Sequence, residues 1–265
     1  MSEGEKKAVP LAVEAVEASL ANAPLGHRII YLPVVTSTMD IARQEAEQGG
    51  EEGIVVVAEE QTAGRGRLGR RWVSSPGQNL YFSILLYPSR WVYSRLSVAV
   101  PVAVARAIRH TCGLYPEIKW PNDVRLGGKK VCGILIETAL QDAEVRYAIA
   151  GIGINVGSNP EEHPDVTAPT TSLAAELGKP VSREDLLQAV LTELSVIYMH
   201  MRGWGDAWGE WQTLLETLGR EIQVRWGEQV EEGVAEAVDG EGNLLLRRPD
   251  GTLVTLAAGE VTLQI

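Results

Sequence analysis

The chain has 265 residues, 45% of them hydrophobic and 22% charged, so it can hold one sizeable domain or one domain with a small appendage. Its formal net charge of −11 argues against nucleic acid as the main partner. Its two cysteines make no CxxC pair or disulfide framework, and no apolar run is long enough to span a membrane, so we expect a cytoplasmic protein without a membrane partner.

Hydrophobic periodicity and turn residues predict alternating helices and strands, followed by a run of short strands. In the first 216 residues we expect helices over 10–21, 36–48, 96–110 and 182–202, and strands over 27–35, 54–57, 79–86, 124–126, 131–137 and 147–156. From about residue 219 the chain predicts four strands between tight turns, over 221–226, 230–238, 243–248 and 253–256. About 45 residues of this kind form a small barrel-like unit that should dock on the main domain.

Two local sequence patterns predict structural roles, a helix cap and core packing. Ser37, followed three residues later by Asp40, has the spacing of a capping box at the start of the second helix. A cap residue can still offer its hydroxyl group to a ligand. Trp204, Trp208 and Trp211 follow the longest helix at near-helical spacing, which is more typical of core residues than of a ligand cage.

A glycine- and arginine-rich loop follows the strand over 54–57 and reads GRGRLGRRW from Gly64 to Trp72. Glycine lets the backbone approach a ligand closely, and guanidinium groups suit carboxylate and phosphate. The glycine spacing fits a dinucleotide fingerprint, but a turn sequence rather than a helix comes next. A nucleic-acid-binding segment is the other alternative. On an acidic chain, a local basic site for a small anion fits better.

A second cationic stretch lies downstream. Lys119 precedes the turn residues Asn122 and Asp123, and Lys129 and Lys130 follow across a glycine turn. The Asn-Asp pair by itself is equally well explained as a plain β-turn. Further on, the strand YAIAGIGINV has two glycines, which remove side chains where something approaches closely. The four histidines show no metal-ligand spacing, so no tightly bound metal is expected.

Four motifs in this order, GRGRLGRRW, KWPNDV, GKKVCGILIE and AGIGINV, resemble those of biotin protein ligases. TSTMD near the start and the small C-terminal barrel extend the resemblance over nearly the whole chain. Met39 stands where many members of that family carry Asn. The resemblance implies an α+β fold like that of class II aminoacyl-tRNA synthetases: a mixed sheet with flanking helices over 1–216, and an SH3-like β-barrel over 217–265.

The resemblance also implies a two-step reaction. The carboxylate of biotin attacks the α-phosphorus of Mg-ATP, which gives biotinyl-5′-AMP and pyrophosphate. The amino group of a lysine on a biotin carboxyl carrier protein then takes the biotinyl group and releases AMP. An anionic carboxylate that attacks an anionic phosphate needs nearby positive charge, which the two cationic stretches supply.

The site residues follow from the motifs. The expected catalytic residues are Lys130, Arg65, Arg67 and Lys119. Biotin would contact Ser37, Thr38, Met39, Gln61, Gly64, Arg65, Gly66, Arg67, Lys130, Gly133, Gly151 and Gly153. ATP or the adenylate would contact Arg65, Arg67, Arg70, Trp72, Lys119, Asn122, Asp123, Lys130 and Asn155, with Asp123 near Mg²⁺.

Other readings of the sequence predict different activities. A lipoate–protein ligase shares the fold relation, although we would not expect it to carry both the arginine-rich loop and KWPND. A non-catalytic biotin-binding module would not need the second cationic stretch. Relatives that also bind DNA carry a helix-turn-helix domain of about 60 residues, whereas about 25 precede the first strand here, so we expect a monofunctional enzyme without a DNA partner. A homodimer and the identity of the acceptor protein are left open.

Overall fold

The structure is a computed structural model that describes residues 10–142, 144–160, 163, 166, 168–226, 228–257 and 259–263. The two ends of the predicted domains, residues 1–9 and 264–265, lie outside this range, as do parts of the loop between 160 and 169. No helix among the described residues is both long and apolar enough to cross a membrane.

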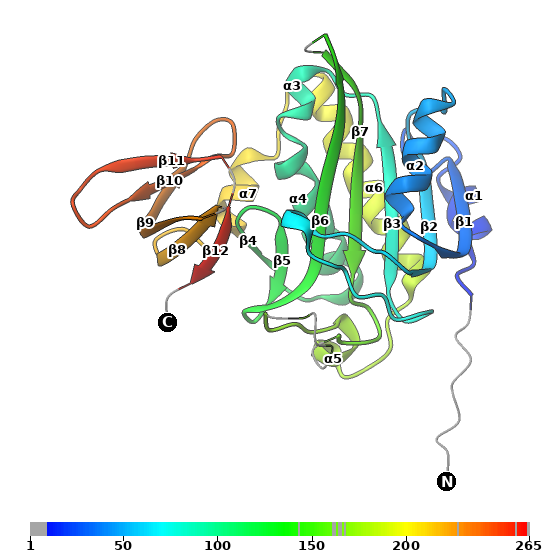
Figure 1. The fold of residues 1–265 in the computed structure, drawn as a ribbon. Helices are drawn as coiled ribbons and strands as arrows, with labels where there is room; N and C mark the ends of the chain where they lie inside the picture. The colour runs from blue at the N-terminus through cyan, green and yellow to red at the C-terminus, as the bar shows by residue number, and fades with distance from the viewer. Residues whose placement is uncertain are drawn as a thin grey trace.

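The main sheet has seven strands in the order β1-β2-β3-β7-β6-β5-β4 (Figure 1). β1 and β2 run parallel, and the other neighbours pair antiparallel. The strands are β1 (Arg28–Val35), β2 (Ile54–Gln61), β3 (Leu80–Leu86), β4 (Glu117–Lys119), β5 (Asp123–Leu126), β6 (Lys129–Gln141) and β7 (Glu144–Ile154). This mixed sheet confirms the predicted α+β fold class.

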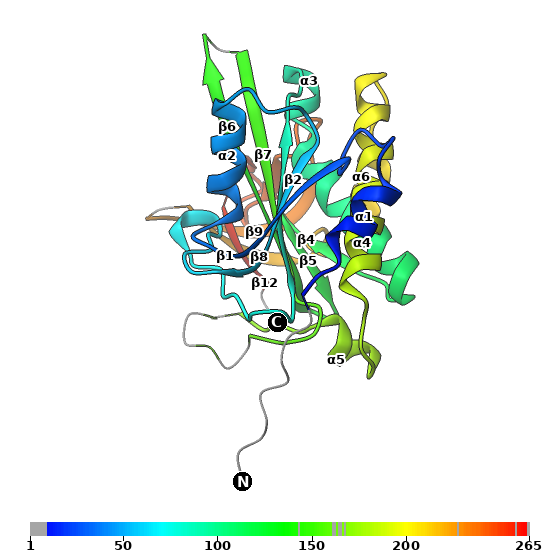
Figure 2. The same ribbon diagram turned by 90° about the vertical axis from the view of Figure 1, so that its right-hand side faces the viewer.

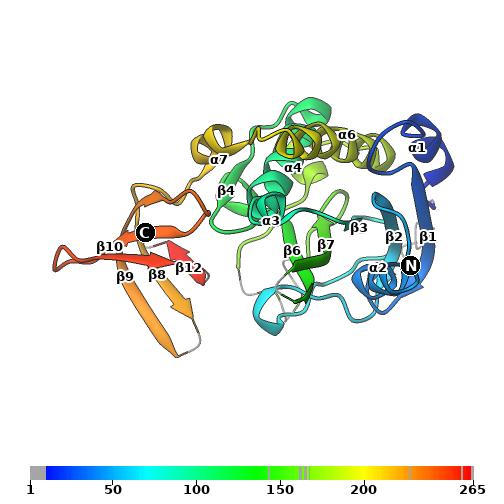
Figure 3. The same cartoon turned by 90° about the horizontal axis from the view of Figure 1, so that it is seen from above.

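Helices cover both faces of this sheet, which explains why every residue of β3 is buried. α1 (Val13–Ser19), α4 (Leu96–Cys112) and α6 (Arg183–Arg202) lie on one face, and α2 (Thr38–Glu47) lies on the other (Figures 2 and 3). The glycine- and arginine-rich loop, which contains the 3₁₀ turn Arg67–Gly69, crosses the same face as α2. The short helices are α3 (Arg90–Tyr93), α5 (Leu173–Leu177) and α7 (Trp208–Leu214).

The C-terminal strands form a second sheet beside the first. They are β8 (Glu221–Trp226), β9 (Gln229–Val238), β10 (Leu244–Arg247), β11 (Leu253–Leu256) and β12 (Glu260–Leu263), all antiparallel in the order β11-β10-β9-β8-β12. The predicted elements lack β12, and they also lack β4, α3 and α5 of the main domain. β12 exists because its residues pair with β8, 35 to 41 positions earlier. The sheet is joined to the main domain by a hydrogen bond of 2.9 Å from Trp120 Nε1 to the Gly242 carbonyl.

Two sequence interpretations are only half right. Ser37 caps α2, because its hydroxyl accepts from the Met39 N–H, but the Asp40 carboxylate reaches Arg65 at 2.8 Å instead of completing a capping box. Trp211 is buried in the core, whereas Trp204 is 76% exposed. Trp204 adopts a positive φ in the turn after α6, and this turns its side chain away from the core.

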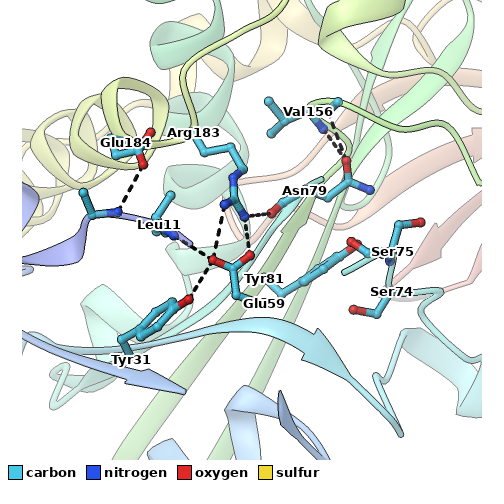
Figure 4. Close-up of polar contacts among 12 residues, drawn as sticks. Leu11, Tyr31, Glu59, Ser74, Ser75, Asn79, Tyr81, Val156, Arg183 and Glu184 are labelled. Carbon is cyan, nitrogen blue, oxygen red and sulfur yellow. Dashed lines mark hydrogen bonds and ion pairs between the residues drawn. The ribbon is translucent and has the colours of Figure 1, made fainter. Parts of the chain in front are cut away.

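A buried ion pair joins α6 to the sheet (Figure 4). Arg183 Nη1 lies 2.6 Å from Glu59 Oε2 at the end of β2. The other carboxylate oxygen accepts from the Leu11 N–H at 2.8 Å and from the Tyr31 hydroxyl at 2.9 Å. Burial acts to raise the pKa of Glu59, but these hydrogen bonds outweigh it and lower the pKa. The same burial and the nearby carboxylate raise the pKa of Tyr31 to about 12.

We therefore expect R183M to lower the free energy of unfolding by about 3 kcal/mol, because it leaves a largely buried carboxylate without its counter-ion. R202M is the matched control: it breaks an ion pair to Glu52 at the exposed end of the same helix and should cost less than about 1 kcal/mol. Urea denaturation measures both. Equal losses for the two variants would contradict the assignment.

The difference in free energy of unfolding between wild type and R183M should depend on pH. Since the pKa of Glu59 lies below its ordinary value of 4.5, the stability that the pair contributes is present above that pH. It is lost as the pH falls through the lowered pKa, so wild type and R183M should converge in acid.

Candidate active site

A single cavity collects nearly all of the predicted site residues. It lies between the face of the main sheet, the start of α2, the arginine-rich loop and the edge of the C-terminal sheet. The lining includes Ser37, Thr38, Met39, Gln61, Arg65, Gly66, Arg67, Arg70, Trp72, Lys119, Asn122, Asp123, Lys130, Gly133, Gly151, Gly153 and Asn155. Gly64 is not among the lining residues. Its carbonyl accepts from the Trp72 N–H at 2.9 Å and so closes the base of the loop.

One end of the cavity is small and polar. The Gln61 side-chain oxygen accepts from the Thr38 backbone N–H at 2.9 Å, and the Thr38 hydroxyl lies 2.7 Å from that of Ser83 on β3. Ser37 and Thr38 are both buried although they are polar. Buried hydroxyl and amide groups arranged in this way can pair with a compact ligand group that has both donors and acceptors.

The wall beside this polar end is made of glycines, and two side chains lie against it. A Cβ atom at Gly153 would be 2.5 Å from the Trp72 ring, and one at Gly133 would meet the same ring at 2.5 Å. A Cβ at Gly151 would be 2.7 Å from Met39 Sδ. The glycines therefore admit Trp72 and Met39, and a ligand that used the wall at Gly133 and Gly153 would have to displace the Trp72 ring.

The other end of the cavity is cationic. Lys130 Nζ lies 2.6 Å from Asp123 Oδ1, and Arg67 Nη1 donates to Asn122 Oδ1 at 3.1 Å. Burial lowers the pKa of Lys119 and of Arg67, partly offset in both by the Asp123 carboxylate. Positive groups held in a partly desolvated cavity bind an anion more strongly than the same groups would in water.

Arg65 is held at the mouth of the cavity by two carboxylates, Asp40 at 2.8 Å and Glu137 at 3.5 Å. Its Nη2 atom is nevertheless buried without a hydrogen-bond partner, as are Trp72 Nε1 and Asn155 Oδ1. Buried polar atoms are normally paired in native proteins, so three unpaired ones around one cavity indicate where ligand groups belong.

The C-terminal sheet also contributes to the site, which the sequence did not predict. Glu260, the first residue of β12, forms an ion pair with Arg70, and both residues line the cavity. This pair raises the pKa of Arg70 and lowers that of Glu260. Glu260 could not be recognised beforehand, because nothing near it in the sequence points to a residue 190 positions earlier.

The cavity offers little for a metal held by the protein alone. Within the described part of the chain, no three His, Cys, Asp or Glu side chains converge as metal ligands. Asp123 is one of two carboxylates near the cations, with Glu260, and Lys130 and Arg70 respectively contact them. Such a site suits Mg²⁺ that arrives with a polyphosphate, since Mg²⁺ keeps several waters and uses only one or two carboxylates there.

Known proteins resemble this chain in sequence and in structure. Residues 31–155 match the model of the Biotin/lipoate A/B protein ligase family, and residues 217–263 match the biotin protein ligase C-terminal domain. The bifunctional ligase/repressor BirA of Bacillus subtilis is 33% identical over 93% of this chain and 77% of its own length. The biotin–[acetyl-CoA-carboxylase] ligase of Paracoccus denitrificans is 34% identical, over 77% of this chain and 88% of its own length.

A solved structure extends the likeness to three dimensions. The biotin protein ligase of Aquifex aeolicus, in complex with biotin and ATP, superposes with a TM-score of 0.74 at 29% identity. The match covers 89% of this chain and 98% of that one. It therefore includes both the main sheet and the C-terminal sheet.

The packing of Trp72 on the glycine wall gives a direct prediction. G153A places a Cβ atom against the indole, so the ring should leave the wall and become more accessible to acrylamide, a collisional quencher of tryptophan fluorescence. The matched control is G240A, because a Cβ atom at Gly240 meets nothing within 4 Å. In a W72F background G153A should leave the quenching unchanged. Equal quenching of wild type and G153A would show that the ring does not pack there.

Proposed function

Since the chain belongs to the biotin/lipoate A/B protein ligase family, we propose that it attaches biotin to a lysine of a biotin carboxyl carrier protein in an ATP-dependent reaction. The reaction proceeds through biotinyl-5′-AMP. The relative from Paracoccus denitrificans is named for acetyl-CoA carboxylase, which supports the carrier of such a carboxylase as the acceptor.

One observation carries this proposal: a single cavity is lined by a polar end, a glycine wall and a cationic end. Their order follows from the strand register, because Ser83, which contacts Thr38, pairs with Gly151, and Gly133 pairs with Gly153 on one side and Asp123 on the other. The ureido group of biotin has one acceptor and two donors, which match the side chains of Ser37, Thr38 and Gln61. The apolar ring and tail of biotin then run along the glycines. The biotin carboxylate is thereby carried toward Lys130, where ATP can meet it.

In the first step a carboxylate oxygen of biotin attacks the α-phosphorus of ATP, and pyrophosphate leaves. Both reactants are anionic, so their approach requires positive charge at the point of contact. Lys130, at the cationic end and next to Gly133 of the glycine wall, would contact both the carboxylate and the α-phosphate. Arg67 and Lys119 stabilise the charge that develops on the phosphoryl oxygens.

In the second step the acceptor lysine attacks the carbonyl carbon of the mixed anhydride, and AMP leaves. This anhydride hydrolyses in water, so the loop with Arg65 and Arg67 should close over it. Within the cavity, the Asn155 amide donates to the Thr171 carbonyl at 3.0 Å, which directs its unpaired Oδ1 to accept from the adenine amino group. Trp72 packs near the adenine once it leaves the glycine wall.

The same proposal covers the metal ion, the domain division and the location of the protein in the cell. Asp123 would contact the Mg²⁺ that accompanies the phosphates, with waters completing its coordination. The division between a catalytic domain over 1–216 and an SH3-like domain over 217–265 is supported by the family match over 217–263. A cytoplasmic location fits the two free cysteines. A homodimer and the lack of a DNA partner are left as predictions from the sequence.

The test of this function is biotin-dependent exchange between ATP and pyrophosphate. We expect exchange with biotin and none with lipoate. K130A should reduce it by at least about a hundredfold, because the group that links carboxylate and α-phosphate is lost. K129A changes the exposed neighbouring lysine and should remain active. Exchange with lipoate alone would mean that the substrate is lipoate and not biotin. No exchange with either compound would mean that the chain is a non-catalytic binding module.

A second prediction concerns retention of the intermediate. R67A should release biotinyl-5′-AMP about tenfold faster than wild type, since one charge-assisted contact and the bond to Asn122 are lost. The half-life of the adenylate on the purified protein measures this. R109A, on the exposed surface of α4, serves as the control. An unchanged half-life in R67A would rule out closure by this residue.

A further inference from the structure

Asn79, just before β3, has more hydrogen bonds than its position in a surface turn would suggest. It is 1% exposed. Its Oδ1 atom accepts from three consecutive backbone N–H groups, those of Val156 at 2.8 Å and of Gly157 and Ser158 at 3.2 Å (Figure 4). Its Nδ2 atom donates to the Ser158 hydroxyl at 3.1 Å. One side chain thus pairs with the backbone N–H groups of the segment that follows β7.

This segment begins directly after Asn155. The Asn155 N–H donates to the Val131 carbonyl at 2.8 Å, and its side-chain amide donates to the Thr171 carbonyl. These bonds leave Oδ1 buried and unpaired in a residue that lines the cavity. The direction of that oxygen therefore depends on where the backbone of 155–158 is held.

The backbone of Asn79 is itself held in place by a hydrogen bond (Figure 4). Its backbone carbonyl accepts from Arg183 Nη1 at 3.3 Å, and Arg183 is held by Glu59. The neighbouring Gln78 carbonyl accepts from the Gly157 N–H at 2.9 Å, which adds a second tie to the same segment. Asn79 does not line the cavity, so it acts on a ligand only through the residues that it holds.

We infer that Asn79 is a positioning residue for the nucleotide half of the site and acts through Asn155. This inference rests on the proposed function and adds a residue to it. The biotin half is held by different contacts, the bonds of Gln61 and Ser83 to Thr38, so loss of Asn79 should affect the two substrates unequally. A residue that only stabilised the fold would not separate them.

The experiment compares N79A with wild type in the exchange assay. We expect KM for ATP to rise about tenfold, the cost of one misplaced hydrogen bond. The dissociation constant for biotin, measured by calorimetry, should stay within about twofold of wild type. N79D should restore KM for ATP, because its carboxylate can still accept from the three N–H groups and from the Ser158 hydroxyl.

A double-mutant cycle shows whether the effect passes through Asn155. In an N155A background, N79A should raise KM for ATP no further, since the oxygen that it positions is gone. Y198F is the matched control: it removes a buried hydroxyl bond of 2.6 Å to Glu52 and should lower stability without changing KM for ATP. If N79A does not fold, N79S takes its place.

The inference is overturned if N79A leaves KM for ATP unchanged, weakens ATP and biotin equally, or adds its full effect to that of N155A. It is also overturned if N79D is as impaired as N79A. The wild-type reaction distinguishes rejection of the role of Asn79 from rejection of the proposed function. If wild type shows biotin-dependent exchange, only the role of Asn79 is rejected.

Discussion

The constraint on which the site depends is the concentration of positive charge in one partly buried cavity. Each of three cations has a carboxylate partner: Asp123 for Lys130, Asp40 and Glu137 for Arg65, and Glu260 for Arg70. Without them the cations would repel one another in a region where water screens poorly. The carboxylates thus allow an arginine-rich loop to fold onto an acidic protein.

These partners also set a requirement for any anion that binds in the cavity. A ligand carboxylate or phosphate must compete with a carboxylate that already contacts the cation, so a single weak contact adds little binding free energy. A ligand that reaches several cations at once replaces several partners together. The unpaired Arg65 Nη2 shows where a ligand can gain a bond without displacing any of them.

The sequence predicted well the features that depend on neighbouring residues. The longer helices, most of the strands, the cap at Ser37 and the loop from Gly64 to Trp72 follow from local spacing, and the structure places them close to where they were expected. It could not predict contacts between distant segments. The Asp40 carboxylate was assigned to a capping box because its true partner, Arg65, is brought near only by the fold. β12 and Glu260 were missed for the same reason, and so was the position of the Trp72 ring on the glycine wall.

The spacing of the two ends of the cavity follows from β3, an interior strand of the main sheet. Ser83 on β3 supports Thr38 at the polar end of the cavity, and Asn79, just ahead of the strand, holds the segment after Asn155 at the other end. Four residues of extended chain separate Asn79 from Ser83, which is about 13 Å. In the same register Ser83 pairs with Gly151 and Tyr81 with Gly153, so the glycine wall lies between the two ends. Because β3 is buried on both faces, this spacing cannot change without disturbing the core.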